Sequence, residues 1–124
     1  MNLDECLARA CEQVPGLHQG ALALLPEGLL IGGVGAGSSF EREPLVRSAA
    51  RALQRSAHTA AAFVEHVFVS RHELVVIARG KRYPRLALAL ACSTEPNLAF
   101  VMTASRAALR ELEATIDVRG LELT

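Results

Sequence analysis

The sequence contains no tryptophan and few other aromatic residues. Its 124 residues include one tyrosine and four phenylalanines, although 51% of all residues are hydrophobic. The apolar content is therefore mostly alanine, leucine and valine, and we expect a core packed by small aliphatic side chains. A chain of this length can bury such a core without disulfides or metal, so residues 1–124 are predicted to form a single domain.

An excess of charge of either sign is also missing. Thirteen Lys and Arg residues balance 13 Asp and Glu residues, which gives a net charge of +0 and a pI of ≈ 6.9. Non-specific binding to nucleic acid depends on a basic surface, so no nucleic-acid partner is expected. Near-zero net charge favours self-association, because copies do not repel one another.

Long apolar runs and a secretory leader are lacking as well. Pro, Gly or charged residues interrupt each apolar run before it could span a membrane. Acidic Asp4 and Glu5 stand where a signal peptide needs basic charge. The three cysteines fit no metal spacing and cannot all pair, and the four histidines are scattered. We therefore expect a cytoplasmic protein with reduced thiols, no membrane insertion, no metal and no cofactor.

Three consecutive strands are predicted over residues 63–70, 73–79 and 85–92. The first two are rich in β-branched residues, which favours extended backbone. The third alternates leucine and alanine and carries no polar side chain before Cys92. Both faces of this strand should therefore be covered by helices.

The same alternation occurs in residues 20–25, which lead through Pro26-Glu27-Gly28 into a return strand over 29–34. The shared pattern predicts that strands 20–25 and 85–92 are neighbours in one sheet. The alanine side would then let a helix approach closely, and the leucine side would fill a wider gap.

Three helices complete the pattern, over residues 2–14, 43–61 and 95–115. Pro15 ends the first, and Ser93 or Thr94 is expected to cap the last. Residues 117–124 alternate weakly and are expected to form a flexible tail or to add a short strand. The polar residues predicted to lie outside the apolar stripe of the last helix are Arg106, Arg110, Glu111 and Glu113.

A row of arginines marks the second helix. Arg47, Arg51 and Arg55 recur at every fourth position, and His58 follows closely. Such a row is usually a solvated face. The alternative is a surface for an acidic partner, where Arg is the preferred cation.

Two further segments have alternative readings. The glycine-rich residues 32–39 could cradle a phosphate. Their spacing is not G-x-G-x-x-G, however, and no P-loop lysine follows. The alternative is a connection that ends an edge strand. The basic turn 79–85, with Tyr83 among its cations, could grip phosphate or an RNA base, and is otherwise a solvated turn.

The strand over 63–70 is the predicted sheet edge. It mixes apolar residues with Glu65 and His66, so it should be less buried than the other two strands. An apolar edge strand is a template for pairing with another chain.

The order helix, two strands, helix, three strands, helix predicts an α/β three-layer sandwich with an antiparallel sheet. In this order the chain resembles the Roadblock/dynein light chain domain family. Pro26-Glu27-Gly28 departs from the Asp-Gly or Asn-Gly turn that is common there. The resemblance is carried by Val14-Pro15-Gly16-Leu17, Gly20-Ala21-Leu22-Ala23, Gly28-Leu29, the helix 44–60 and Asn97-Leu98-Ala99-Phe100-Val101.

The resemblance implies strand order 2-1-5-4-3 and a homodimer in which strands 63–70 pair across a two-fold axis. The second helices would then lie side by side, and the partner would be a Ras-like small GTPase. The residues expected in the dimer interface are Leu53, Val64, His66 and Phe68. Those expected to contact the GTPase are Arg47, Arg51, Arg55 and His58.

Two other functions stay open from the sequence. One is a small-molecule or nucleotide sensor that uses the glycine-rich segment, and the other is a purely structural assembly subunit. No nucleophile–base pair or carboxylate pair stands out, so an enzyme is not expected.

Overall fold

The computed structural model describes residues 2–25, 27–35, 43–48, 50–51, 65–94 and 97–119. Residues 43–48 and 50–51 are helical, and we call them the arginine helix. The labelled elements are α1 (Leu3–Ala10), β1 (Leu17–Leu24), β2 (Leu29–Gly35), β3 (Glu65–Val69), β4 (Leu74–Arg79), β5 (Leu86–Cys92) and α3 (Leu98–Arg119).

The five strands form one antiparallel sheet in the order β2-β1-β5-β4-β3. In the centre of the sheet, Leu22 lies opposite Leu88 and Ala23 lies opposite Ala87. The predicted strand order and the predicted pairing of the two Leu/Ala strands are therefore confirmed.

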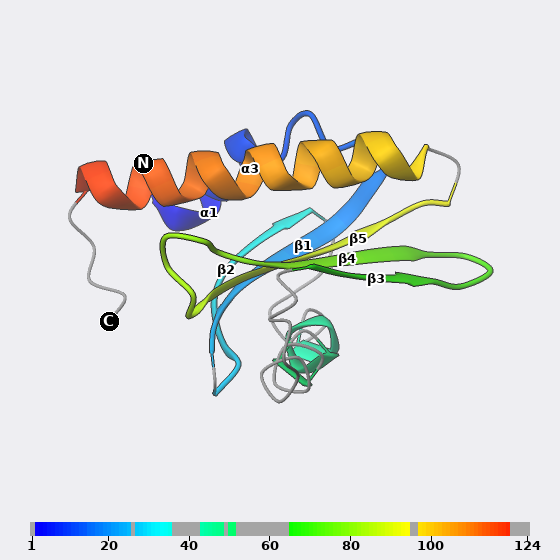
Figure 1. The fold of residues 1–124 in the computed structure, drawn as a ribbon, viewed down its shortest axis with the longest axis horizontal. Coiled ribbons are helices and arrows are strands. Elements are labelled where there is room, and N and C mark those ends of the chain that lie inside the picture. Colours follow the sequence, from blue (N-terminus) through cyan, green and yellow to red (C-terminus); the bar gives the residue numbers. More distant parts are fainter. Residues whose placement is uncertain are drawn as a thin grey trace.

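The two faces of the sheet carry different side chains. On the face that we call the leucine side, Leu22, Leu88 and Leu90 are buried in one core with residues of α1 and α3. On the other face, the alanine side, the alanines of β1 and β5 pack against Val46 and Ala50 of the arginine helix. Figure 1 shows α1 and α3 on one side of the sheet and the arginine helix (teal) on the other. The predicted three-layer sandwich is confirmed.

The first helix and the first strand differ from their predicted bounds. α1 ends at Ala10, and residues 11–16 form turns instead of continuing the helix. β1 begins at Leu17 instead of residue 20, because Leu17 still pairs with Cys92 across a shift in register.

The capping prediction for the last helix is wrong. The side chain of Asn97, and not that of Ser93 or Thr94, accepts a hydrogen bond of 2.8 Å from the backbone N–H of Ala99. The helix also continues to Arg119, past the predicted end at 115, because Ile116 is fully buried and holds the last turns against the core. Among the described helices, none is both long and apolar enough to cross a membrane.

Candidate interaction surfaces

β3 is an edge of the sheet, as predicted, since among the described strands it pairs only with β4. Two of its apolar side chains are notably exposed, Phe68 at 47% and Val69 at 68%. Val67 packs against the leucine-side core. Because side chains alternate along a strand, Phe68 points to the alanine side, where the arginine helix lies.

Phe68 borders a groove of ≈ 320 Å³ between the sheet and the arginine helix. The edge strand and the arginine helix therefore form one continuous surface on the alanine side. The other side chains that line the groove are Gln19, Pro44, Leu45, Ser48, Glu73 and Val75.

The arginine helix presents its cations to solvent and its apolar residues to the sheet. Arg47 and Arg51 are both exposed, and Arg47 forms an ion pair of 2.7 Å with Glu43, one turn earlier. Leu45 is buried as its position in the predicted stripe requires, and Val46 is buried beside it. The structure thus brings Arg47 and Arg51 together on one open face.

Several predicted site residues lie outside the described part of the chain. Of the expected GTPase contacts these are Arg55 and His58, and of the expected dimer contacts they are Leu53 and Val64. His66 is described by its backbone only, which lies in β3 opposite Ile77.

The described glycines of the segment 32–39 have structural roles. Gly32, Gly33 and Gly35 belong to β2, and the backbone N–H of Gly33 donates a hydrogen bond of 2.9 Å to a carboxylate oxygen of Asp4 in α1. A phosphate that bound this N–H would have to displace that carboxylate. At Gly35, φ is +87°, and a Cβ atom would lie 2.3 Å from the backbone oxygen of His18, so only glycine fits.

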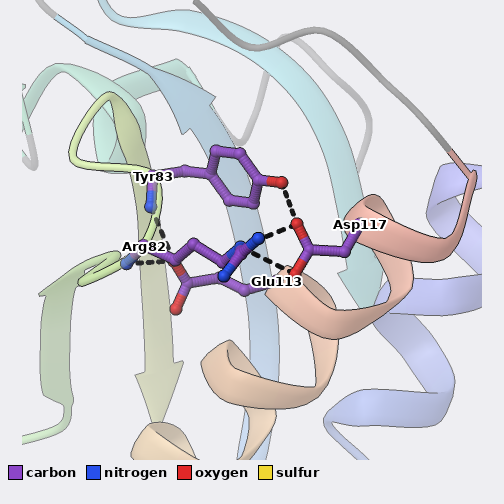
Figure 2. Close-up of polar contacts among 4 residues, drawn as sticks. All are labelled: Arg82, Tyr83, Glu113 and Asp117. Atoms are coloured by element: carbon purple, nitrogen blue, oxygen red, sulfur yellow. Dashed lines mark hydrogen bonds and ion pairs between the residues drawn. The ribbon is translucent and has the colours of Figure 1, made fainter.

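The basic turn between β4 and β5 is held to α3 by two carboxylates (Figure 2). One oxygen of Glu113 accepts hydrogen bonds of 2.8 Å from the backbone N–H groups of both Arg82 and Tyr83. Asp117, one helical turn later, accepts a hydrogen bond from the Tyr83 hydroxyl. Its carboxylate also forms an ion pair with Arg82, with 2.7 Å between Nε and Oδ2. The Tyr83 hydrogen bond, with the neighbouring Arg82 guanidinium, lowers the pKa of the Asp117 carboxyl. Tyr83 and Arg82 therefore anchor the turn to α3.

The position predicted for Glu113 is wrong, since its side chain is buried at 6% exposure. A signal was present in the sequence, because Glu113 stands four residues after Leu109 and so continues the apolar stripe. The adjacent Gly80 leaves room for the carboxylate, since a Cβ atom there would lie 2.8 Å from a Glu113 oxygen.

A second contact ties α3 to the edge strand. Arg106 donates two hydrogen bonds to the carboxylate of Glu65, from Nε at 2.5 Å and from an Nη atom at 2.8 Å. These hydrogen bonds are the main cause of the lowered pKa of Glu65. The ion pair lies on the leucine side, opposite the surface formed by Phe68 and the arginine helix.

The Glu65–Arg106 pair should make stability depend on pH. A carboxyl whose pKa is lowered by folding stabilises the protein above its ordinary value of 4.5, and this contribution is lost as the pH falls through the lowered pKa. Glu65→Gln should therefore lower the free energy of unfolding by about 0.5–1 kcal/mol at pH 7, since the pair is partly exposed. The difference from the wild type should shrink below pH 4.5. Denaturant unfolding from pH 7 to pH 3 measures it, with exposed Glu111→Gln as the control. A difference that stayed constant over this range would contradict the assignment.

The three cysteines are core residues. All are buried, and no disulfide joins them. Burial raises the pKa of the Cys11 thiol to about 12 and that of Cys92 to about 11. Both thiols therefore stay protonated at neutral pH, and a protonated thiol is a poor nucleophile and a poor metal ligand. Within the described ranges, no three His, Cys, Asp or Glu side chains form a group that could hold a metal ion.

Solved structures with the same architecture identify the fold. MglB of Myxococcus xanthus matches with a TM-score of 0.78 and 14% identity, over 94% of this chain and 95% of that chain. A Roadblock/LC7 domain from Streptomyces avermitilis matches with a TM-score of 0.76 and 13% identity, over 94% of this chain and 98% of that chain. The chain has the roadblock fold.

A third structure with the roadblock fold is MglC of Myxococcus xanthus, which matches with a TM-score of 0.66 and 18% identity, over 93% of this chain and 99% of that chain. No protein-family model and no curated protein matches the sequence. The expected resemblance to the Roadblock family is thus confirmed at the level of the roadblock fold.

Proposed function

We propose that the chain is a non-enzymatic, cytoplasmic homodimer that binds a Ras-like small GTPase and regulates or scaffolds it. The observation that carries the proposal is an open apolar edge strand beside a face of exposed arginines, within a roadblock fold. Bacterial members of the family that the sequence resembles bind and regulate Ras-like GTPases. Such a regulator biases the switch loops of the GTPase between two arrangements without donating a catalytic group.

The difference between the two sheet edges supports pairing through β3. At the other edge, α1 approaches β2 and Asp4 accepts the N–H of Gly33. The pairing of β2 with β1 is also irregular between Leu22 and Ala23. Covered and irregular edges resist pairing with another chain, whereas β3 exposes Phe68 and Val69. An MglB structure with a tetrameric arrangement, with a TM-score of 0.64 and 18% identity, is a solved relative that self-associates.

The arginine helix supports the choice of partner surface. Pairing of two copies through β3 places their alanine sides on one continuous sheet, so the two arginine helices lie on the same face. Arg47 and Arg51 of each copy then form one cationic platform. Arginine is enriched at protein interfaces and pairs well with carboxylates, so the platform suits an acidic surface on the GTPase.

Charge reversal on the arginine helix tests this placement. Arg47→Glu with Arg51→Glu should weaken binding of the Ras-like GTPase encoded nearest to this protein's gene by about 30-fold or more, because two attractive contacts per copy become repulsive. Calorimetric titration with the GTPase loaded with GDP, and then with a non-hydrolysable GTP analogue, measures the affinity.

The matched control is a single exposed arginine on the leucine side. Arg9→Glu makes the same charge change as Arg51→Glu but lies in α1, on the opposite face of the sheet. Arg9→Glu should leave binding of the GTPase unchanged. Circular dichroism should show that this variant and the arginine-helix variants are folded. Equal affinity of Arg51→Glu, Arg9→Glu and the wild type would refute the placement on the arginine helix.

A further inference from the structure

A second groove lies on the leucine side, between α3 and the strands β3 and β4. Its volume is ≈ 520 Å³, which is in the range of pockets that hold small ligands. Leu109 and Ala78 supply apolar surface, and the hydroxyl of Thr103 supplies a polar group. Across the sheet from the arginine helix, this groove is separate from the surface proposed for the GTPase.

The groove is cationic in an otherwise neutral protein. Three basic side chains lie at it against two carboxylates, which leaves an excess of one positive charge. Both carboxylates are already engaged, Glu65 by Arg106 and Glu113 by the backbone of the β4–β5 turn. The three basic side chains are those of Lys81, Arg106 and Arg110, whereas Arg79 lies opposite Ala87 in the sheet, so its side chain points to the alanine side.

Two of the basic side chains are available to bind an anion from solution. Neither Lys81 nor Arg110 forms an ion pair with any residue that the structure describes, and both are exposed at the groove. Lys81 lies close enough to Glu65 to help lower the pKa of that carboxyl, so its charge acts inside the groove. In the same turn, the side chains of Arg82 and Tyr83 are bound to Asp117. The turn therefore contributes Lys81, and not Arg82, to the groove.

From this arrangement we propose that the groove binds a small organic phosphate, with its dianionic group on Lys81 and Arg110 and its organic part against Leu109 and Ala78. A phosphate monoester carries about −1.5 to −2 charges at pH 7, which matches the two cations Lys81 and Arg110 better than a single carboxylate does. Arginine binds phosphate through two parallel N–H groups, and lysine adds a point charge. The proposal is independent of the proposed GTPase function.

Titration of the full chain with phenyl phosphate, followed by the backbone amide signals in NMR, tests the proposal. At 0.15 M salt, the shifts should concentrate in residues 79–82 and in α3 around Arg106 and Arg110. Lys81→Glu with Arg110→Glu should weaken binding about tenfold or more, because two attractive charges become repulsive. Lys81→Gln with Arg110→Gln, which only neutralises the cations, should have an intermediate effect.

The control is a second pair of exposed basic residues away from the groove, Arg9→Glu with Arg71→Glu, which should bind as the wild type does. Benzoate, with the same ring and a single charge, should bind at least about fivefold more weakly. Equal affinity for benzoate, shifts spread evenly over all basic residues, or unchanged binding in the Lys81/Arg110 variants would overturn the proposal. Tighter binding of an oligoglutamate peptide than of phenyl phosphate would also overturn it, in favour of an acidic protein segment.

Discussion

Glu113→Ala should lower the free energy of unfolding by about 2 kcal/mol, because two partly buried N–H groups lose their acceptor, and each such loss costs about 1–3 kcal/mol when the group is fully buried. The carboxylate accepts the N–H groups of both Arg82 and Tyr83, and its side chain is almost fully buried. In a domain of this size, such a loss corresponds to a decrease in melting temperature of roughly 10 °C. Denaturant and thermal unfolding measure it, with all variants at one protein concentration, since the stability of the proposed dimer would depend on concentration.

Two variants separate this interaction from a general effect on the helix. Glu111→Ala changes an exposed glutamate of the same helix and should alter the free energy of unfolding by less than about 0.5 kcal/mol. Glu113→Gln keeps a carbonyl oxygen that can accept both N–H groups, so it should cost less than half as much as Glu113→Ala. If Glu113→Ala were as stable as Glu111→Ala, the carboxylate would not be what holds the turn.

Phe68→Glu should convert the proposed dimer into a folded monomer. The phenylalanine is half-exposed on the edge strand, and in the proposed dimer it would be buried against the partner copy. A buried aromatic residue at the centre of an interface carries a large share of the binding energy, and a buried carboxylate adds a desolvation cost. The dissociation constant of the dimer should therefore rise about 100-fold or more. Analytical ultracentrifugation over a range of protein concentrations measures it.

Phe100→Glu is the matched control, since it makes the same substitution at a more exposed phenylalanine. Phe100 lies near the start of α3, is 71% exposed, and belongs to no part of the proposed interface. The Phe100→Glu variant should keep the mass of the wild type. A dimer that survived Phe68→Glu and dissociated with Phe100→Glu would move the interface from β3 to α3.

The layers and the strand order could be predicted because they follow from short-range alternation. Leu88 and Ala89 point to opposite faces of β5 wherever that strand lies, and the same holds for Leu22 and Ala23 in β1. Two strands with leucine on one side and alanine on the other fit best as neighbours, and the register of the sheet places Leu22 opposite Leu88. Local pattern therefore determines both the faces and the pairing.

The polar contacts that fix the turns and helix ends could not be predicted in the same way. Glu113 meets the backbone of Tyr83, which is 30 residues away, and Arg106 meets Glu65, which is 41 residues away. Such partners depend on where α3 crosses the sheet. The repeat of apolar residues along the helix does not determine that position. The sequence does not single out Asn97 as the cap, because Ser93 and Thr94 are also good capping residues and only the position of the helix start distinguishes the three.

The unequal edges of the sheet have a consequence for how many copies can join. If β3 is the only edge that accepts another strand, pairing of two copies through β3 leaves neither copy with a free β3 edge. Both outer edges of the joined sheet are then β2 strands. At those edges the Asp4 carboxylate of α1 already accepts the N–H of Gly33, so a third copy meets an edge that is less suited to pairing than β3. Growth by strand addition thus ends at a closed pair, which protects a chain without net charge from forming open fibres.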